Sequence, residues 1–323
     1  MEMKKNILGV DIGGTKCAVI YGQKEGDTLH LVEKVKFPTT SVDETIANIC
    51  SEIEQMMGRH GLDSSNTGAI GISCGGPLDS KRGVVMSPPN LPGWNDIPIV
   101  RMLEERFGIR TGIHNDANAC ALAEWKFGAG VGTQNMVFLT FGTGLGAGLI
   151  LDGKLYAGTN DNAGELGHIR LSEFGPVGYG KCGSFEGFAS GGGIAQLARF
   201  KVSEKQQMGE SVTWCPPGQL DSISAHTVAL AAASGDPLAL EIYRISATYL
   251  GRGLAMVIDL LNPEVIVIGS IYVRNRELME PFVLQEIERE ALSHARRVCS
   301  VRPAKLGEQI GDYAALSVAA NLI

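Results

Sequence analysis

Two glycine-rich stretches, LGVDIGGTKCAVI (Leu8 to Ile20) and FLTFGTGLGAGLI (Phe138 to Ile150), decide the fold of this chain. Each predicts a strand, a tight turn of small residues and a second strand. Glycine lacks a Cβ and tolerates positive φ, so the backbone can bend sharply there and bring its N–H groups close to an anion. Taken singly, either stretch is also typical of an ordinary β-hairpin. The pair, with Asp11 just before the first turn, indicates a polyphosphate site built from hairpins.

Neither turn matches the common nucleotide-binding loops. The chain contains no GxxxxGK[ST] motif, and the spacing of Gly142, Gly144 and Gly146 does not fit GxGxxG. A nucleotide site at these turns would therefore have a different construction.

The composition excludes several classes of protein. The 323 residues are 44% hydrophobic and 20% charged, as expected for a soluble protein with room for two cores. The net charge of −7, with scattered Lys and Arg, argues against nucleic-acid and membrane-surface partners. No apolar run approaches the roughly 20 residues that span a bilayer, and because MEMKKN leads almost at once into the first predicted strand, no signal peptide is expected. Seven cysteines without a CxxC pair predict free, buried thiols in a cytoplasmic protein.

Strands and helices alternate along the chain. Periodicity and capping signals predict a helix from SVDE (Ser41 to Glu44) to about Met57, a strand at Gly68 to Gly75, a long helix at Pro237 to Leu261, a buried parallel strand at Val265 to Ser270, and a last helix from about Gly311 to Ile323. With one glycine hairpin in each half, this order predicts an α/β protein of two similar domains with a cleft between them.

Three segments between these elements carry polar residues. The proline-rich segment Met86 to Asp96 predicts a rigid, exposed loop, and Ser203 to Asp221 is interpreted as an irregular insertion of unknown purpose. The strand-to-helix junction Thr111 to Gly128 has Asn115 and Asp116 at the crossing, where they either cap the helix or act in catalysis.

Five motifs, in this order, resemble the ROK group of repressors and sugar kinases in the actin-like ATPase superfamily. They are DIGGTK (Asp11 to Lys16), PNLPGW (Pro89 to Trp94), NDANA (Asn115 to Ala119), FGTGLGAG (Phe141 to Gly148) and GELGH, which contains Glu165 and His168. The resemblance covers essentially the whole chain. It implies two actin-like (ribonuclease H-like) ATPase domains: a small one, residues 1–117 and 309–323, and a large one, residues 118–308. Without the resemblance, the pair in GELGH is typical of a solvated turn.

The resemblance also implies roles for individual residues. Asp116 matches the catalytic base, which takes a proton from a sugar hydroxyl as that oxygen attacks the γ-phosphate of ATP. The start of a helix is expected to keep its carboxylate ionised. Asp11 matches a residue that holds Mg²⁺ through water. The matched sugar contacts are Gly76, Asn90, Asn115, Asp116, Glu165, His168 and Glu186, and the matched ATP contacts are Asp11, Gly13, Gly14, Thr15, Lys16, Gly142, Thr143, Gly144 and Gly269.

The chain departs from the family pattern at a zinc motif. Many members carry CxCGxxGCxE, completed by the histidine of GELGH, and the corresponding segment here is VGYGKCGSFE, Val177 to Glu186. The three cysteine positions hold Val177, Tyr179 and Ser184, and Cys182 falls where the pattern has no ligand. A tetrahedral site needs about four N or S ligands, so no zinc is expected. His168 would instead be held by hydrogen bonds or by packing from Tyr179 or its neighbours.

A second departure is GSI, Gly269 to Ile271, where many members have a run of glycines near the adenosine. Two functions stay open. The first is a kinase that transfers phosphate from ATP, with Mg²⁺, to the 6-hydroxyl of a hexose or N-acetylhexosamine. The second is a sugar-binding regulator or sensor without kinase activity. The family's regulators carry a helix-turn-helix domain ahead of the first turn, and about ten residues precede DIGGTK here, which favours the kinase. The family also implies a homodimer.

Overall fold

Two compact units make up the chain in the computed structural model, which describes residues 4–323. The first unit runs to Gln134 and also contains Gly148–Ala163 and Lys305–Ile323, while the second contains Asn135–Ala147 and Gly164–Ala304. The domains implied by the family resemblance, with their boundary at residue 117, are a different partition of the chain and stay a prediction.

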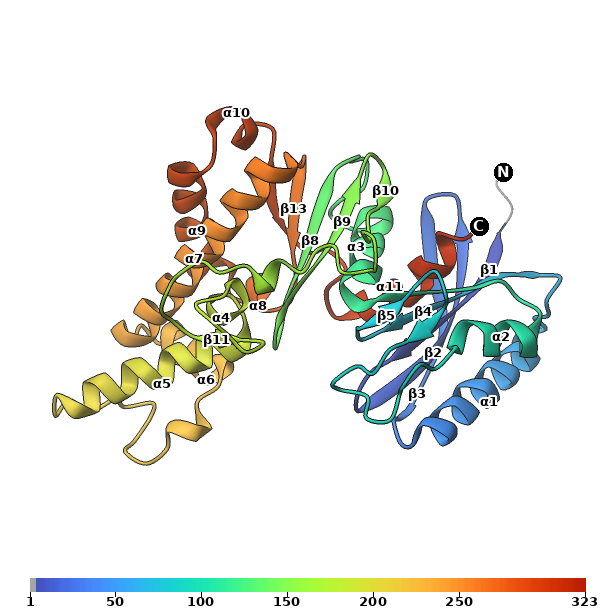
Figure 1. The fold of residues 1–323 in the computed structure, drawn as a ribbon, viewed down its shortest axis with the longest axis horizontal. Coiled ribbons are helices and arrows are strands. Elements are labelled where there is room, and N and C mark those ends of the chain that lie inside the picture. Colours follow the sequence, from blue (N-terminus) through green and yellow to red (C-terminus); the bar gives the residue numbers. More distant parts are fainter. Residues whose placement is uncertain (1–3) are drawn as a thin grey trace. The chain divides into compact units, whose positions relative to one another are not determined.

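A five-stranded sheet, in the order β3-β2-β1-β4-β7, forms the middle layer of the first unit (Figure 1). Its strands are β1 (Lys5–Ile12), β2 (Lys16–Glu25), β3 (Thr28–Pro38), β4 (Thr67–Cys74) and β7 (Thr111–Asn115). Strands β1, β2 and β3 pair antiparallel, whereas β4 pairs parallel with both β1 and β7. The first glycine stretch is therefore the hairpin that the sequence predicts.

Helices cover both faces of this sheet because its strands carry apolar residues on both sides. Leu8 and Val10 pack with helices α1 (Val42–His60) and α2 (Ile99–Phe107) on one face. Ile7 packs with the last helix, α11 (Ile310–Ala320), on the other face. The predicted first helix is confirmed, with Ser41 as its N-cap, and it extends three residues beyond Met57, to His60.

Helix α11 lies directly on the sheet because the strands beneath it carry glycine. A Cβ at Gly71 would lie 2.2 Å from both the carbonyl oxygen of Ala315 and the amide nitrogen of Ala319. A Cβ at Gly9 would lie 3.0 Å from that of Ala315. The helix backbone therefore occupies the space that larger residues at these two positions would fill.

A buried carboxylate, Glu124, joins helix α3 (Asp116–Phe127) to the segment that leads into α11. Its oxygens accept hydrogen bonds from the backbone N–H groups of Ala129 (2.7 Å), Lys305 (3.0 Å) and Leu306 (2.9 Å). These hydrogen bonds replace those that the carboxylate would make with water. They therefore offset the free energy cost of burying a charged group.

The second sheet has the order β10-β9-β8-β13-β14. Its strands are β8 (Met136–Phe141), β9 (Leu145–Leu151), β10 (Lys154–Leu155), β13 (Val265–Ile268) and β14 (Ser300–Pro303). All four residues of β13 are buried, and β13 pairs parallel with both β8 and β14. The buried parallel strand predicted from VIVIGS is therefore confirmed.

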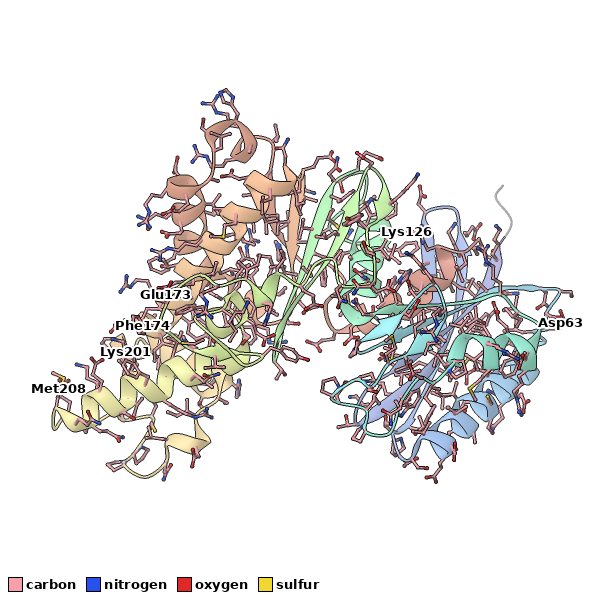
Figure 2. The ribbon with its side chains drawn as sticks, in the orientation of Figure 1. Asp63, Lys126, Glu173, Phe174, Lys201 and Met208 are labelled. Carbon is pink, nitrogen blue, oxygen red and sulfur yellow. The ribbon has the colours of Figure 1, made fainter. Side chains whose placement is uncertain are left out.

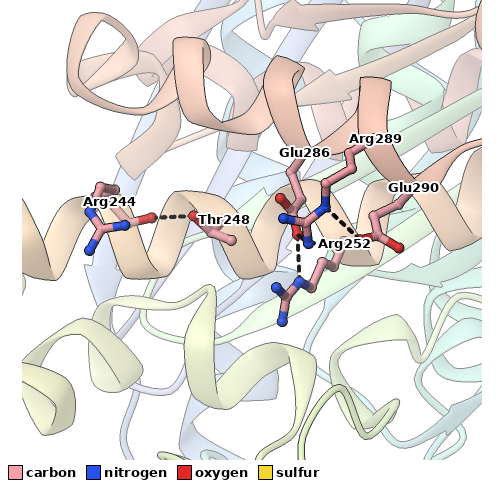
Figure 3. A network of polar contacts seen from close by, with 6 residues as sticks. All are labelled: Arg244, Thr248, Arg252, Glu286, Arg289 and Glu290. Atoms are coloured by element: carbon pink, nitrogen blue, oxygen red, sulfur yellow. Dashed lines mark hydrogen bonds and ion pairs between the residues drawn. The ribbon is translucent and has the colours of Figure 1, made fainter.

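The helices of the second unit are α4 (Phe185–Phe188), α5 (Gly191–Gln207), α6 (Ala225–Ala233), α7 (Pro237–Leu261), α8 (Ile271–Arg274), α9 (Arg276–Glu290) and α10 (Ser293–Arg296). Helix α7 has the bounds predicted for it. It is joined to α9 through buried Glu286, which accepts hydrogen bonds from Arg252 (2.5 Å) and Arg289 (2.8 Å) (Figure 3).

Short elements complete the chain: β5 (Leu78–Asp79), β6 (Val84–Val85), β11 (Val177–Gly178), β12 (Lys181–Cys182) and the 3₁₀ turns η1 (Leu166–His168), η2 (Leu220–Ser222) and η3 (Gly307–Gln309). The seven cysteines are free, and five of them are buried. Within residues 4–323, no helix combines the length and apolar character needed to cross a membrane.

Two predictions about irregular segments are corrected. The predicted insertion begins too early, because α5 continues through Ser203 to Gln207, so Lys201 lies within the helix and Met208 just after it (Figure 2). The loop from Met86 to Asp96 is irregular as predicted but is not simply exposed. Its apolar residues Leu91 and Trp94 are only 1% exposed, because they fill the core beside α1 and α2.

Candidate functional site

The first glycine turn connects β1 to β2 and is held by Thr39. The hydroxyl of Thr39 donates to the Gly13 carbonyl (2.6 Å), and its backbone N–H donates to the Thr15 carbonyl (3.1 Å). On another side, a Cβ at Gly14 would lie 2.4 Å from the carbonyl oxygen of Asn90. The turn therefore packs against the loop that carries Asn90, which the family resemblance implies as a sugar contact.

Positive φ, the conformation expected at the glycine turns, does not occur there. Gly13, Gly14, Gly142 and Gly144 all lie outside the left-handed region. Glycine is required instead by close approach: a Cβ at Gly13 would lie 2.8 Å from the Lys16 carbonyl oxygen. The predicted sharp bend is confirmed, and of the two glycine properties that predict it, the missing Cβ applies here whereas positive φ does not.

The carboxyl ends of three parallel strands bring the predicted polar residues of the first unit together. Asp11 on β1 pairs with Ser73 on β4, and the next residue of β4, Cys74, pairs with Asn115 at the end of β7. Asp116 follows at once as the first residue of α3. Ligands of open α/β sheets bind at this edge, outside the carboxyl ends of the strands.

Of the two predicted functions of Asn115 and Asp116, helix capping is confirmed for Asn115, and the catalytic role of Asp116 stays a prediction. Asn115 is the N-cap of α3, and its side chain accepts a hydrogen bond from the Asn118 backbone N–H (2.8 Å). Asp116 is solvent accessible, and desolvation by the surrounding protein raises the pKa of its carboxyl above the usual value. This shift is opposite in direction to the one expected from the helix start alone.

Asp11 lies near two other acidic residues of the first unit. Burial, then the charges of Asp116 and Asp312, raise its pKa from 3.8 to about 6, while Lys34 and Lys16 act against the shift. Asp312, in the first turn of α11, forms an ion pair with Lys34 on β3. Sequence reasoning missed Asp312 and Lys34, whose only local signals are an acidic first turn and a lysine in a strand.

The glycine pair after β4 brings the other predicted sugar contacts of this unit close to one another. A Cβ at Gly75 would lie 3.0 Å from Oδ1 of Asn90, and one at Gly76 would lie 4.0 Å from the Cβ of Asn115. Gly76, Asn90 and Asn115 therefore surround the same edge of the sheet as Asp11 and Asp116.

The second glycine turn connects β8 to β9 and rests on the N-terminus of α5. The backbone N–H groups of Gly191 and Gly192 donate to the carbonyls of Gly142 (2.8 Å) and Thr143 (3.2 Å). Helix N-termini carry unsatisfied N–H groups, and here the turn supplies their acceptors. The sequence stretch SGGG, Ser190 to Gly193, was not recognised as part of the site; its run of three glycines is the signal that was available.

Glu186 lies on the second glycine turn. Its Oε2 accepts a hydrogen bond from the Leu145 backbone N–H (3.0 Å) and is 2.7 Å from the position that a Cβ at Gly144 would take. A side chain at Gly144 would displace this carboxylate. Glu186, which the resemblance implies as a sugar contact, therefore also touches the turn that the resemblance implies as a phosphate contact.

Gly269 and Ser270 follow β13 beside the same turn. The Ser270 hydroxyl lies 4.0 Å from the position that a Cβ at Gly142 would take. Ser270 has φ 55° and ψ −113°, a conformation that glycine adopts readily and serine does not. Ser270, which stands where the family pattern has glycine, therefore has a strained backbone conformation.

His168, Glu165 and Glu186 are neighbours in the second unit. Desolvation and then the charge of Glu186 raise the pKa of Glu165, while His168 acts to lower it. The His168 ring meets that of Tyr179 edge to face, with 6.2 Å between ring centroids. The predicted packing of His168 by Tyr179 is confirmed.

The residues around His168 do not fit a zinc ion. Cys182, the one thiol of the corresponding segment, donates to the Gly175 carbonyl (3.2 Å). Among residues 4–323, no group of three His, Cys, Asp or Glu side chains is placed to hold a metal. The expected lack of zinc stays a prediction, to which this donor set gives support.

The predicted Mg²⁺ site needs other ligands than a zinc site does. Mg²⁺ takes oxygen ligands, keeps several waters, and is commonly held by one or two carboxylates together with substrate phosphates. Asp11 and Asp116 supply such carboxylates close to the first glycine turn, and the pKa of Asp11 is raised first by burial and then by the charges of Asp116 and Asp312. A cation held through water is compatible with these residues.

Comparison with known proteins identifies the family. The model of the ROK family matches residues 7–321. A glucokinase of Streptomyces coelicolor is 33% identical over 314 residues, covering 97% of this chain and 96% of that protein.

Among solved structures, a ROK family glucokinase of Streptomyces griseus in complex with glucose and AMPPNP is 31% identical, with a TM-score of 0.72, and the match covers 98% of both chains. A ROK family transcriptional regulator, a homologue of the Escherichia coli MLC protein, is 27% identical with a TM-score of 0.83; the match covers 98% of this chain and 78% of that one. The chain therefore belongs to the ROK family and has the actin-like ATPase fold of its sugar kinases.

Proposed function

We propose that this protein is an ATP-dependent sugar kinase. The observation that carries the proposal is the meeting of Asp11, Asn115 and Asp116 at the carboxyl ends of β1 and β7, beside a glycine turn held by a neighbouring loop. The glucokinase names of similar proteins, and the glucose and AMPPNP in one solved relative, support it.

Asp116 is the proposed general base. It accepts the proton of the sugar hydroxyl, at the 6-position, as that oxygen bonds to the γ-phosphorus and the bond to the β,γ-bridging oxygen breaks. A base works best when its pKa is near the operating pH. The desolvation that raises the pKa of Asp116 shifts the group in that direction.

The remaining proposed roles follow from chemistry. Asp11 holds Mg²⁺ through water, and the ion neutralises charge on the transferred phosphoryl group. The proposed phosphate and nucleotide contacts are Gly13, Gly14, Thr15, Lys16, Gly142, Thr143, Gly144 and Gly269. The proposed sugar contacts are Gly76, Asn90, Asn115, Glu165, His168 and Glu186, whose amides, carboxylates and imidazole offer both donors and acceptors to hydroxyl groups.

A sugar-binding regulator of the same fold is the second candidate, favoured by the similarity to the solved ROK transcriptional regulator. The two candidates differ in one respect that can be measured. A kinase releases ADP when its sugar is present, whereas a regulator binds the sugar without turnover.

The test is ADP release from Mg·ATP with a panel of hexoses and N-acetylhexosamines, comparing wild type with Asp116→Asn. We expect one sugar to stimulate turnover, and the variant to lose about 10²- to 10⁴-fold of it while still binding that sugar in calorimetry. Sugar binding without turnover by the wild type would instead support the regulator. Full turnover by Asp116→Asn would refute the assignment of the base.

A further inference from the structure

A hairpin stands where many family members carry the zinc motif. Val177 on β11 pairs with Cys182 on β12, and Gly178 pairs with Lys181. The two residues between the strands, Tyr179 and Gly180, have φ of 45° and 75°. Positive φ at both positions is the mark of a type I′ turn, whose twist matches that of the strands.

A glutamine on another element fastens this hairpin. Gln196, in the middle of α5, accepts a hydrogen bond from the backbone N–H of Val177 through Oε1 (2.9 Å) and donates to the carbonyl of the same residue through Nε2 (2.8 Å). The side-chain amide thus pairs with both backbone groups of one residue, as a neighbouring strand would.

Further bonds fix the second strand of the hairpin. The Cys182 thiol donates to the Gly175 carbonyl (3.2 Å), and the Arg170 guanidinium donates to the Cys182 carbonyl (2.7 Å). The thiol and the carbonyl of Cys182 are therefore both occupied by neighbours within the same segment. Such a thiol is a poor candidate for a metal ligand.

The hairpin in turn holds two proposed sugar contacts. The ammonium of Lys181 donates to the His168 carbonyl (2.7 Å), and the Tyr179 ring packs on the His168 imidazole. Just after the hairpin, the Ser184 hydroxyl caps α4 by accepting from the Gly187 N–H (3.1 Å). Helix α4 carries Glu186, which contacts the second glycine turn.

We propose that Gln196 is a positioning residue. By fixing Val177, it holds the hairpin that orients His168 and Glu186, and hydrogen bonds rather than a metal ion fix this segment. The effect on sugar binding rests on the proposed function, whereas the effect on the hairpin does not. The segment is then independent of metal.

The test compares Gln196→Ala with wild type by hydrogen exchange of peptides that cover residues 166–188. Two hydrogen bonds, each contributing about 1 kcal/mol, correspond to roughly 30-fold faster local exchange when both are lost. Gln206→Ala is the matched control, because Gln206 lies on the same helix and donates to the Cys215 carbonyl instead. We expect faster exchange of the hairpin in Gln196→Ala alone.

Sugar affinity and metal content complete the experiment. We expect Gln196→Ala to weaken sugar binding about tenfold, and a chelator to change neither the hairpin exchange nor the melting temperature of the wild type. If Gln196→Ala does not fold, Gln196→Glu keeps the acceptor, loses the donor, and is expected to give a smaller change of the same kind.

Two results would overturn the proposal: unchanged hairpin exchange in both Gln196 variants, or stoichiometric zinc whose removal accelerates exchange of the hairpin. If wild type binds no sugar and yet Gln196→Ala accelerates exchange of the hairpin, the sugar-kinase function fails while the assignment of Gln196 as the clamp of the hairpin stands.

Discussion

Asp11 combines two roles that oppose each other. Its carboxylate faces the start of α11, where a Cβ at Gly311 would lie 3.6 Å from Oδ2, and burial and then two further acidic residues raise its pKa. The same ionised group is proposed to hold Mg²⁺ and destabilises the folded chain when no cation is present. Such conflicts between stability and activity are common at functional sites.

Replacing Asp11 by Asn is expected to stabilise the metal-free protein in a pH-dependent manner. Because the pKa of Asp11 rises from 3.8 unfolded to about 6 folded, the folded state binds more protons between these values, and ionisation lowers its stability as pH rises. Asp11→Asn should raise the free energy of unfolding by about 1–3 kcal/mol at pH 7.5 and roughly half as much at pH 5. Urea titrations at both pH values, in chelator, measure this.

A control for this experiment is Asp63→Asn. Asp63 is exposed (Figure 2), and hydrogen bonds from Ser65 and Asn66 lower its pKa, so its replacement should not stabilise the protein. An effect of Asp11→Asn that is the same at both pH values would contradict the explanation by ionisation.

Residues were predictable where a local motif carries them. Asp11, Asn115 and Asp116 lie in motifs next to predicted strands, whereas their meeting at one edge of the sheet is known only from the strand pairing in the structure. Asp312 could not be found in this way, since it pairs with Lys34 across 278 positions of the chain. The position of Glu186 on the second glycine turn was likewise unpredictable, because it depends on how α4 packs.

At the scale of elements, the contact between α11 and β4 depends on one glycine. Gly71→Ala would place a Cβ 2.2 Å from backbone atoms of Ala315 and Ala319, and backbone atoms cannot turn aside as a side chain can. We expect this variant to lose about 3 kcal/mol of stability or more, measured by chemical denaturation.

Gly58→Ala is the matched control for a glycine replacement. Gly58 lies inside α1, and nothing lies within 4 Å of the position of its added Cβ. Because alanine favours helix over glycine, this variant should gain about 0.5–1 kcal/mol. Equal effects of the two replacements would show that α11 does not rest on Gly71 as described.

Elements with strong local signals were predicted well. Helix α7 has a capping aspartate, proline at its first position and long apolar periodicity, and its bounds were predicted to the residue. Helix α5 has weak apolar periodicity and three glycines at its start, so the sequence does not predict it. For the same reason the predicted insertion includes the last residues of this helix, from Ser203 to Gln207. The hairpin at Val177 was missed because its strands have two residues each.

At the scale of the whole molecule, the division of the chain could not be read from the sequence. The first unit is assembled from three separate segments and the second from two. Local sequence patterns predict strands and helices. They do not indicate which segments, distant in the sequence, pack against a sheet formed by the first part of the chain. The fold was predicted through the order of family motifs, which carries this long-range information.

The charge of the whole molecule gives a prediction that bears on the regulator candidate. With 28 basic and 35 acidic residues, the chain carries a net charge of −7 and should be repelled by the phosphate backbone. We expect no binding to a labelled DNA duplex in fluorescence polarisation at micromolar protein, with or without sugar. Salt-dependent binding in the micromolar range would contradict this and favour a regulator.

The position of α11 has a consequence for the growing polypeptide. The sheet of the first unit has all its strands once residue 115 is made, yet the helix that covers one face of it begins at residue 310. At a synthesis rate of about 5–20 residues per second, roughly ten to forty seconds pass before α11 is made and can cover that face. On the ribosome, the second unit is therefore synthesised in full before the first is complete, and the early half of the nascent chain exposes an apolar sheet face during that interval.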